Sequence, residues 1–351
     1  MSRSSFLKFF PVPKYLQFPA VGFDVSDGSV KYIELLNGAG KVTVGKFGKK
    51  NYGEDLVGTL SAIQKQHGFG MVCVSIPEEE SYFVHIKLPF IKLDEVRGAI
   101  ELQIEEYVPY SANEVEFDYE ILKTDPRPNG YIDVNVAVLP KKIVSKYLDI
   151  FRAASLIPIS VMIEAEATSR AAVPADSKEV VMVVNVGKIN TILSIVVRGS
   201  VRFSYTFKFG GDFIVRHMRE TCLLNDEDAE KIKNERGMVD SRENQYIFEC
   251  LLPIVSSIRD DISKHCEYWS DHKSEFLKGE DFGDISKLIV CGSQSIIPGF
   301  IEYLSVTLGI RTILADTWVN VLKFDEYVPP IGRNDSLEYA TAVGLALSSL
   351  R

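Results

Sequence analysis

The chain has 351 residues, of which 46% are hydrophobic and 25% are charged, and its 39 Lys and Arg against 48 Asp and Glu give a net charge of −9. This length corresponds to two or three folded domains, and the composition is that of a globular protein, not of a disordered, collagen-like or polytopic membrane chain. An acidic balance argues against broad nucleic-acid binding, which depends on neutralising phosphates with Lys and Arg. We therefore expect no nucleic-acid partner.

The five cysteines are scattered along the chain and form no CxxC pair. Zinc sites and disulfide frameworks depend on closer and more regular spacings than these. We therefore expect buried, reduced thiols and no metal held by cysteine.

The first 19 residues form a basic, aromatic arm. No acidic residue precedes Asp24, and Pro11 and Pro13 prevent a long amphipathic helix. The arm can pack on its own domain through its aromatic side chains, which we favour, or it can contact an anionic membrane surface or a partner. Its cations are Arg3, Lys8 and Lys14.

The beginning of the folded region alternates between strands and helices. Apolar and polar residues alternate over 20–36 around the polar turn Ser26–Gly28, which predicts a β-hairpin. The pattern then predicts a strand at 41–47, a helix at 54–67 and a buried strand at 71–76.

Residues 77–159 read as a small α+β unit. A strand at 82–88 precedes an amphipathic helix at 93–107, in which Val96, Ile100 and Ile104 share one stripe. Strands at 117–122 and 131–139 and a helix at 141–154 complete the unit.

The most apolar stretch, Val180 to Val197, carries Asn185, Gly187 and Lys188 near its centre. It therefore predicts two strands joined by a tight turn and not a membrane-spanning helix. A strand at 201–209 leads into Gly210, Gly211 and Asp212 and a helix to 220. The later expected elements are helices at 226–233 and 243–269, a strand at 288–291, a helix ending at 308, a strand at 309–314 and an apolar helix at 336–350.

The two hairpins match each other. FDVSDGSVKYIEL, beginning at Phe23, aligns with VNVGKINTILSIV, beginning at Val184, so that Asp24 corresponds to Asn185. The match indicates a duplicated, two-lobed protein, with chance similarity of two amphipathic hairpins as an equal alternative on this observation alone. Turn amides and hydroxyls can surround phosphate oxygens, and a carboxylate at a strand end can hold magnesium through water.

The order of the motifs resembles the actin-like ATPase superfamily and, within it, the PilM family of type IV pilus assembly proteins, which is similar to FtsA. The resemblance runs from about Ala20 to Leu350. The segment Ala99–Leu122 is the most specific, because general actin-like enzymes lack it. The other segments are Val21–Leu35, Val184–Thr191, Phe209–Asp212, Asp228–Lys233, Ile289–Phe300 and Ala342–Leu347.

This resemblance implies an α/β, actin-like (ribonuclease H-like) fold of two lobes with a small inserted α+β domain. The first lobe would comprise 20–76, 160–178 and the C-terminal helix 336–351. The second would comprise 179–335, with a helical subdomain at about 213–284. The insert, 77–159, would bind a partner, since in this family the groove beside it receives a short N-terminal peptide of PilN, an inner-membrane pilus protein.

The resemblance also implies a site for ATP or ADP with magnesium between the lobes. Asp24 would hold the magnesium through water, and Asp24 and Glu164 are the candidate catalytic residues. The other candidates for the nucleotide site are Ser26, Asp27, Ser29, Lys31, Asn185, Gly187, Asn190, Thr191, Gly210, Gly211, Asp212, Glu230, Lys233, Gly292, Ser293 and Gln294.

Several of these positions depart from the family pattern. Ser26 replaces a glycine, Asn185 replaces an aspartate, and Ser293 and Gln294 replace two of three glycines. Asparagine carries no charge and is a poor base. Binding of nucleotide with weak or no hydrolysis is therefore expected. Glu230 and Lys233 would face the ribose and base; the alternative for this pair is a solvated ion pair of little energetic value.

The favoured function is a cytoplasmic scaffold at the inner face of the cell membrane, coupling a PilN-like tail to pilus motor or platform proteins, in a pilus or a related secretion system. An active ATPase or phosphotransferase is the second reading, against which Asn185, Ser293 and Gln294 argue. An FtsA-like division filament is the third. Homo-oligomerisation and peripheral membrane contact are left open.

Overall fold

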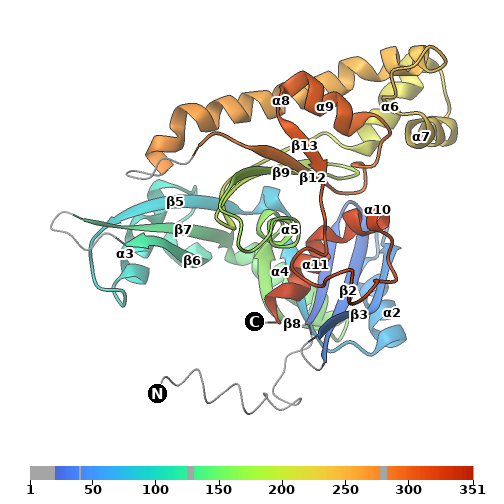
Figure 1. Ribbon diagram of the computed structural model, residues 1–351. Helices are drawn as coiled ribbons and strands as arrows, with labels where there is room; N and C mark the ends of the chain where they lie inside the picture. The colour runs from blue at the N-terminus through green and yellow to red at the C-terminus, as the bar shows by residue number, and fades with distance from the viewer. Residues whose placement is uncertain (1–19, 39–40, 125–129, 277–282, 351) are drawn as a thin grey trace.

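The computed structural model describes residues 20–38, 41–124, 130–276 and 283–350, so the basic arm lies outside the described residues. These residues build two five-stranded sheets and a separate three-stranded sheet. Figure 1 shows the second large sheet above the first, with the small sheet extending to one side. In this described part, no helix is long and apolar enough to cross a membrane.

The first large sheet has the strand order β3-β2-β1-β4-β8. Strands β1 and β2 form the expected hairpin, β3 adds to it antiparallel, and β4 and β8 join on the other side in parallel. Helix α2 covers it, and Asp55 caps α2 by accepting the Gly58 N–H at 2.7 Å. The bounds are β1 Ala20–Ser26, β2 Ser29–Gly38, β3 Lys41–Asn51, α2 Leu56–His67, β4 Met71–Ile76 and β8 Ile157–Ile163.

The second large sheet repeats this topology with the order β11-β10-β9-β12-β13. Strands β9 and β10 form its hairpin, β11 extends it antiparallel, and β12 and β13 follow in parallel. The internal duplication inferred from the two hairpins is therefore present in the topology. The bounds are β9 Val180–Val186, β10 Thr191–Val197, β11 Ser200–Phe207, β12 Lys287–Cys291 and β13 Arg311–Leu314.

The three-stranded sheet, of order β5-β7-β6, carries helix α3 and has its own apolar core. Val96, Ile100 and Ile104 are buried as the stripe predicted, although α3 ends at Gln103 and continues as a 3₁₀ turn, Ile104–Glu106. The bounds are β5 Tyr82–Pro89, α3 Val96–Gln103, β6 Val115–Thr124 and β7 Tyr131–Pro140.

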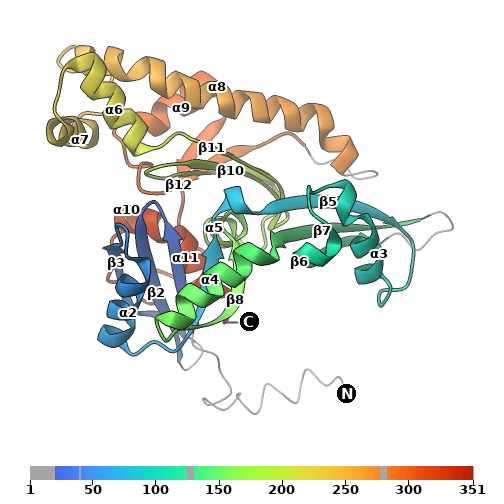
Figure 2. The same cartoon turned by 180° about the vertical axis from the view of Figure 1, so that it is seen from behind.

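Helix α4, Lys141–Ala153, lies on the first large sheet and not on the small one. Its Tyr147 and Phe151 enter the same core as Phe23 and Leu60, and Figure 2 shows the helix beside α2 and β8. The boundary expected at residue 159 therefore differs from the packing, because α4 and β8 belong to the first core. The small sheet and its helix are confined to about residues 82–140.

Four helices pack against the second sheet or extend from it: α6 Gly211–Cys222, α7 Asp226–Glu235, α8 Gln245–Phe276 and α9 Phe300–Leu308. Helix α8 continues through Pro253. A disulfide links Cys222 of α6 to Cys250 of α8, so the expectation that all cysteines are reduced is wrong for this pair. Sequence spacing gave no signal, because 28 residues separate the two cysteines.

Helices α5, Glu164–Ala172, and α11, Ala340–Ser348, pack together between the two large sheets (Figure 1). Glycines allow the close approach: a Cβ added to Gly344 of α11 would lie 1.7 Å from the Ala167 carbonyl oxygen of α5, and one on Gly22 of β1 would lie 2.0 Å from the Ala342 carbonyl oxygen. Helix α11 follows α10, Arg333–Ser336, and the 3₁₀ turn Leu337–Tyr339.

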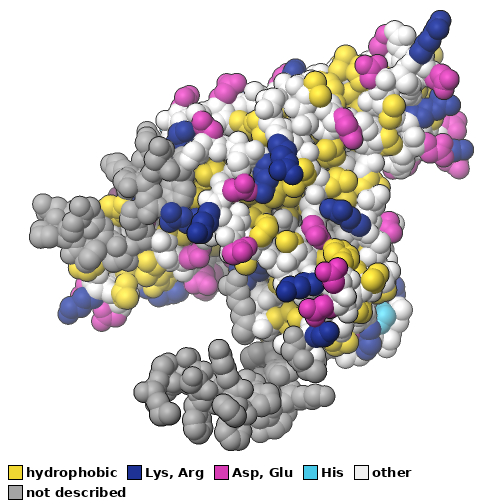
Figure 3. Space-filling model, in the orientation of Figure 1, with side chains coloured by type: hydrophobic (Ala, Val, Ile, Leu, Met, Phe, Trp, Pro, Cys, Tyr) yellow, Lys and Arg dark blue, Asp and Glu magenta, His cyan; other side chains and the backbone are white. Residues whose placement is uncertain are grey.

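The surface mixes charges of both signs. On the face drawn in Figure 3, Lys and Arg side chains lie among Asp and Glu side chains, with hydrophobic side chains between them. Nucleic-acid binding requires a basic stripe, and the face drawn in Figure 3 instead carries interspersed charges of both signs.

We expect Gly344→Ala to lower the free energy of unfolding by about 2–3 kcal/mol, because the new methyl group cannot enter the α5–α11 contact without moving backbone. Urea denaturation measures this. The matched control is Gly70→Ala, where an added Cβ meets nothing within 4 Å, and we expect a change within about 0.5 kcal/mol. Equal stability of the two variants would contradict the described packing.

Candidate functional site

A cleft of about 690 Å³ lies between the β1–β2 turn of the first lobe and helices α6 and α7 of the second. Its volume is within the range of small-molecule sites. Its lining is polar and strongly charged. Its residues are Asp27, Ser29, Lys31, Lys49, Asn51, Lys188, Gly211, Asp212, Val215, Arg216, Arg219, Asp226, Glu227, Glu230, Lys233, Ser293 and Gln294.

The structure places the sequence-predicted residues in two groups. Those that line the cleft are Asp27, Ser29, Lys31, Gly211, Asp212, Glu230, Lys233, Ser293 and Gln294. The others, which are not among the lining residues, are Asp24, Ser26, Glu164, Asn185, Gly187, Asn190, Thr191, Gly210 and Gly292.

Asp24 and Lys31 form a buried ion pair across the β1–β2 hairpin. The Lys31 Nζ lies 2.9 Å from Asp24 Oδ2 and also donates to the Ser26 Oγ at 3.1 Å. Burial alone would lower the Lys31 pKa, but the Asp24 and Asp27 carboxylates raise it above its ordinary value. Lys31 thus takes one oxygen of the Asp24 carboxylate, and the other, Oδ1, lies 3.5 Å from the Ser75 Oγ.

Glu164 begins helix α5 beside this pair. Burial and the neighbouring Asp24 charge raise the Glu164 pKa well above its ordinary value. Its Oε1 accepts a hydrogen bond from the Asn185 Nδ2 at 3.2 Å. Asn185, which stands where the family has an aspartate, cannot ionise.

The tips of the two hairpins touch directly. The Asp27 carboxylate accepts the Ile189 N–H at 3.0 Å and packs against Gly187, whose added Cβ would lie 2.7 Å from Asp27 Oδ2. Beside this contact, the Asn190 side chain donates to Glu79. The two turns that would hold phosphate are thus joined across the lobes by Asp27, and Asn190 of the second turn is also bonded to Glu79.

The start of helix α6 packs on the turn between β9 and β10, residues 187–190, which we call the second loop. The Gly211 N–H donates to the Gly187 carbonyl at 3.1 Å and the Asp212 N–H to the Lys188 carbonyl at 2.9 Å. These two amides are therefore occupied, although free amides at a helix start would favour phosphate. Gly210 is buried against Lys188, where an added Cβ would lie 2.5 Å from its carbonyl oxygen.

Lys233, Glu230 and Gln294 form a polar cluster at the far end of the cleft. The Lys233 Nζ lies 2.8 Å from Glu230 Oε1 and 2.7 Å from Gln294 Oε1. Lys233 is 0% exposed and the Glu230 side chain is 51% exposed, so only the lysine end of the pair is withdrawn from solvent. Burial lowers the Lys233 pKa, while Glu230 opposes the shift.

Two predicted residues have structural positions. The Thr191 hydroxyl is buried and donates to the Phe209 carbonyl at 2.7 Å. Gly292 has a φ of 92°, and an added Cβ would lie 2.4 Å from the Val186 carbonyl oxygen, so the turn requires glycine.

The sequence reading missed four cations that line the cleft: Lys49 at the end of β3, Lys188 in the second loop, and Arg216 and Arg219 on α6. The two arginines are three residues apart and so share a helix face. The spacing of Arg216 and Arg219, soon after Gly210–Asp212, is the sequence signal that could have identified them as residues of the cleft. Among the described residues, no group of three or more His, Cys, Asp or Glu could hold a metal ion.

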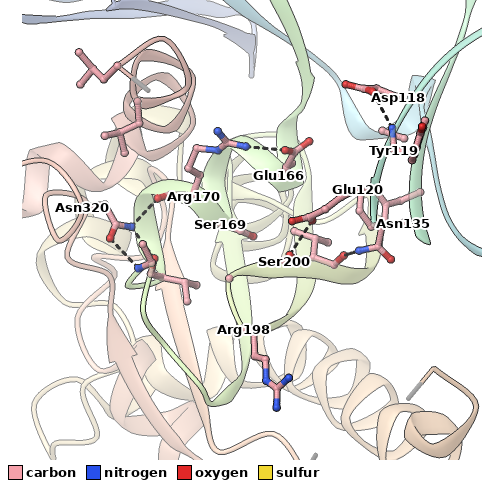
Figure 4. A pocket seen from close by; sticks show the side chains of 18 of the residues that line it. Asp118, Tyr119, Glu120, Asn135, Glu166, Ser169, Arg170, Arg198, Ser200 and Asn320 are labelled. Carbon is pink, nitrogen blue, oxygen red and sulfur yellow. Dashed lines mark hydrogen bonds and ion pairs between the residues drawn. The ribbon is translucent and has the colours of Figure 1, made fainter. Parts of the chain in front are cut away.

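A second groove, of about 620 Å³, lies between the small sheet and the two lobes (Figure 4). Strand β6 contributes Asp118 and Glu120, and α5 contributes Glu166, which pairs with Arg170 at 2.9 Å. The remaining lining residues are Asn37, Val42, Phe83, Tyr119, Asn135, Ala137, Ser169, Val173, Ala175, Arg198, Gly199, Ser200, Val201, Asn320, Leu347 and Leu350.

Hydrogen bonds hold the walls of this groove together. The Asn135 Nδ2 of β7 donates to the Val201 carbonyl of β11 at 2.6 Å, and the Ser200 Oγ donates to Glu120 at 2.8 Å (Figure 4). The Ser169 Oγ is buried at the groove and has no hydrogen-bond partner in the described part of the chain. Residues of this groove were not identified from the sequence, because they come from eight separate stretches of the chain.

Comparison with known proteins assigns the family. The family model described as type IV pilus assembly protein PilM matches residues 22–350. The chain belongs to this family. The actin-like two-lobed α/β fold expected from the sequence is confirmed, as is the pilus-assembly family.

One solved structure supports the fold, and two others are reported as similar. The structure titled PilM-PilN type IV pilus biogenesis complex is similar with a TM-score of 0.77 at 17% identity, covering 95% of this chain and 99% of that chain. The ethanolamine utilization protein EutJ from Carboxydothermus hydrogenoformans follows with a TM-score of 0.49 at 15% identity, covering 96% and 91%. MreB5 of Spiroplasma citri, bound to ADP, has a TM-score of 0.49 at 12% identity, covering 93% and 95%.

Glu78 hydrogen-bonds to both lobes, and its buried carboxyl group makes the stability of the protein depend on pH. Its carboxylate accepts the Ala165 N–H of α5 at 3.2 Å and a hydrogen bond from Ser204 of β11. Burial raises the Glu78 pKa from 4.5 to about 6. Below both values the unfolded and folded states are equally protonated; as pH rises from 4.5 to 6, the unfolded state loses its proton first and stability falls.

We expect Glu78→Gln to remove this loss, since its amide oxygen can accept the Ala165 N–H, its amide N–H can donate to the Ser204 hydroxyl, and the group does not ionise. Between pH 4.5 and pH 7, the fall in the free energy of unfolding should be smaller than in the wild type by about 2 kcal/mol. Urea denaturation at several pH values measures it, with the exposed Glu54→Gln as control. A Glu78→Gln profile parallel to the wild-type profile would refute the assignment.

Proposed function

We propose that this protein is a scaffold of type IV pilus assembly that acts on the cytoplasmic face of the inner membrane and binds the N-terminal tail of a PilN-like membrane protein. Membership of the PilM family over residues 22–350 is the observation that carries the proposal. The similar PilM structure is a complex with PilN.

The groove beside the small sheet is our candidate for the peptide site. It is deep enough for a short extended segment, and it offers backbone and side-chain hydrogen-bonding groups from both walls. Three carboxylates, on Asp118, Glu120 and Glu166, favour a peptide that carries a positive charge, while Arg170 neutralises part of the acidic wall. The unpartnered Ser169 hydroxyl provides a buried group for the peptide backbone.

We expect Ser200→Trp to weaken binding of a synthetic N-terminal tail peptide of the PilN-like protein at least about tenfold, because an indole at the groove rim fills the site. Isothermal titration calorimetry measures the Kd. Leu102→Trp is the matched control, because Leu102 is 86% exposed on α3 and does not line the groove. Equal affinities of wild type and Ser200→Trp would place the peptide elsewhere.

We also propose that the interlobe cleft binds ATP or ADP without rapid turnover. Lys31, Lys49, Lys188, Arg216 and Arg219 supply cations for a triphosphate, and the volume suits a nucleotide. Slow or no hydrolysis is expected, because Asn185 stands where the family has an aspartate and an amide is a poor base. Asp24 Oδ1 would hold a magnesium ion through water, while Lys31 keeps Oδ2.

The nucleotide proposal predicts that replacing Arg216 and Arg219 together by alanine weakens ADP and ATP binding about tenfold or more, because charge-assisted hydrogen bonds are lost. Fluorescence titration gives the affinity, and Arg242→Ala, which changes an exposed arginine outside the cleft, is the control. Phosphate release by the wild type should equal the buffer background. Release well above background would favour the active-ATPase reading.

A further inference from the structure

One carboxylate occupies the position in the cleft that is best suited to an anion. Both oxygens of Asp27 face the second loop: a Cβ on Gly187 would lie 2.7 Å from Oδ2 and 2.9 Å from Oδ1, and Oδ1 accepts the Ile189 N–H at 3.0 Å. One backbone amide of this turn, the Ile189 N–H, therefore donates to a negatively charged group, while the Gly187 N–H donates to the Asn190 carbonyl. Backbone amides in turns of this kind are donors to phosphate oxygens.

The geometry of the first hairpin fixes the direction of the Asp27 side chain. Asp27 and Gly28 form the two-residue turn between β1 and β2, with φ values of 54° and 70°. Such turns need left-handed backbone at both positions, which Asp, Asn and Gly tolerate. Because β1 and β2 are buried in the first core, the turn presents Asp27 to the second loop as a fixed projection.

We propose that Asp27 is an internal substitute for a phosphate group, which competes with the phosphates of a nucleotide for the second loop. This inference rests on the nucleotide site proposed above and adds its regulation. In the ligand-free arrangement, the contact joins the two lobes and takes the Ile189 N–H. Entry of a phosphate requires the Asp27–Ile189 hydrogen bond to break and the two carboxylate charges, of ligand and protein, to separate.

Charge near Asp27 is consistent with a site for an anion. Lys31, held by Asp24, also feels the Asp27 charge, and Lys188 of the second loop lies 3.7 Å from Asp212. Removal of the Asp27 carboxylate leaves these cations and the Ile189 amide for a ligand. The competition therefore sets nucleotide affinity through a residue that makes no favourable contact with the ligand.

The test compares Asp27→Gly and Asp27→Asn with the wild type, using ADP, ATP and inorganic pyrophosphate as probes. Asp27→Gly keeps the turn and removes the competing group, so its affinity for each probe should rise about tenfold or more, the value of a charged hydrogen bond. Asp27→Asn also suits the turn but retains a neutral acceptor, so its gain should be smaller. Amide hydrogen exchange at Ile189 in the absence of ligand should be faster in Asp27→Gly.

Glu243→Gln is the control, because Glu243 is an exposed carboxylate that does not line the cleft. Its affinities should change less than about twofold, since an exposed charge outside the site is screened by solvent. An equal gain in Glu243→Gln, or unchanged affinity in Asp27→Gly when the wild type binds, would overturn the inference alone. Absence of binding to every probe in all variants would overturn the nucleotide site and the inference together, and would leave the peptide proposal unaffected.

Discussion

The close contact between α5 and α11 is the constraint on which the rest of the molecule depends. These helices fill the space between the two large sheets, and they meet where Gly344 lies against the Ala167 backbone. Helix α5 also begins with Glu164, which is buried beside the Asp24–Lys31 pair of the interlobe site, and continues with Glu166 and Ser169, which line the second groove. One helix thus positions residues of both candidate sites, and its position is fixed by packing that has no room for a side chain at 344.

The interlobe site is built around charges that are already paired within each lobe. Lys31 pairs with Asp24 in the first lobe, and Lys233 pairs with Glu230 and donates to Gln294 in the second. A ligand that used these groups would have to offset the interactions that they already make. The Asp27–Ile189 hydrogen bond, by contrast, joins the two lobes in the described arrangement.

The sequence predicted the strands and their pairing well, because hairpin turns and alternating apolar residues are local signals. Asp24 to Lys31 and Asn185 to Thr191 were recognised for that reason, and the duplicated topology followed. The sequence did not predict that α4 packs in the first core, because an amphipathic stripe indicates that a helix packs but not against which core. The direction of the Asp27 side chain, the occupied amides of Gly211 and Asp212, and the peptide groove depend on segments that only the folded chain brings together.

The discontinuous first lobe has a consequence for the order of folding during synthesis. Ala20, Ile33 and Leu35 share a core with Trp318, Val343 and Ala346, so the earliest strands wait for some of the last residues to leave the ribosome. The second lobe, by contrast, has all its strands between residues 180 and 314 and can bury its hydrophobic core earlier. One face of the β1–β2 hairpin therefore lacks its partners until the end of synthesis, while the other face packs in a core whose buried residues all lie between 21 and 156.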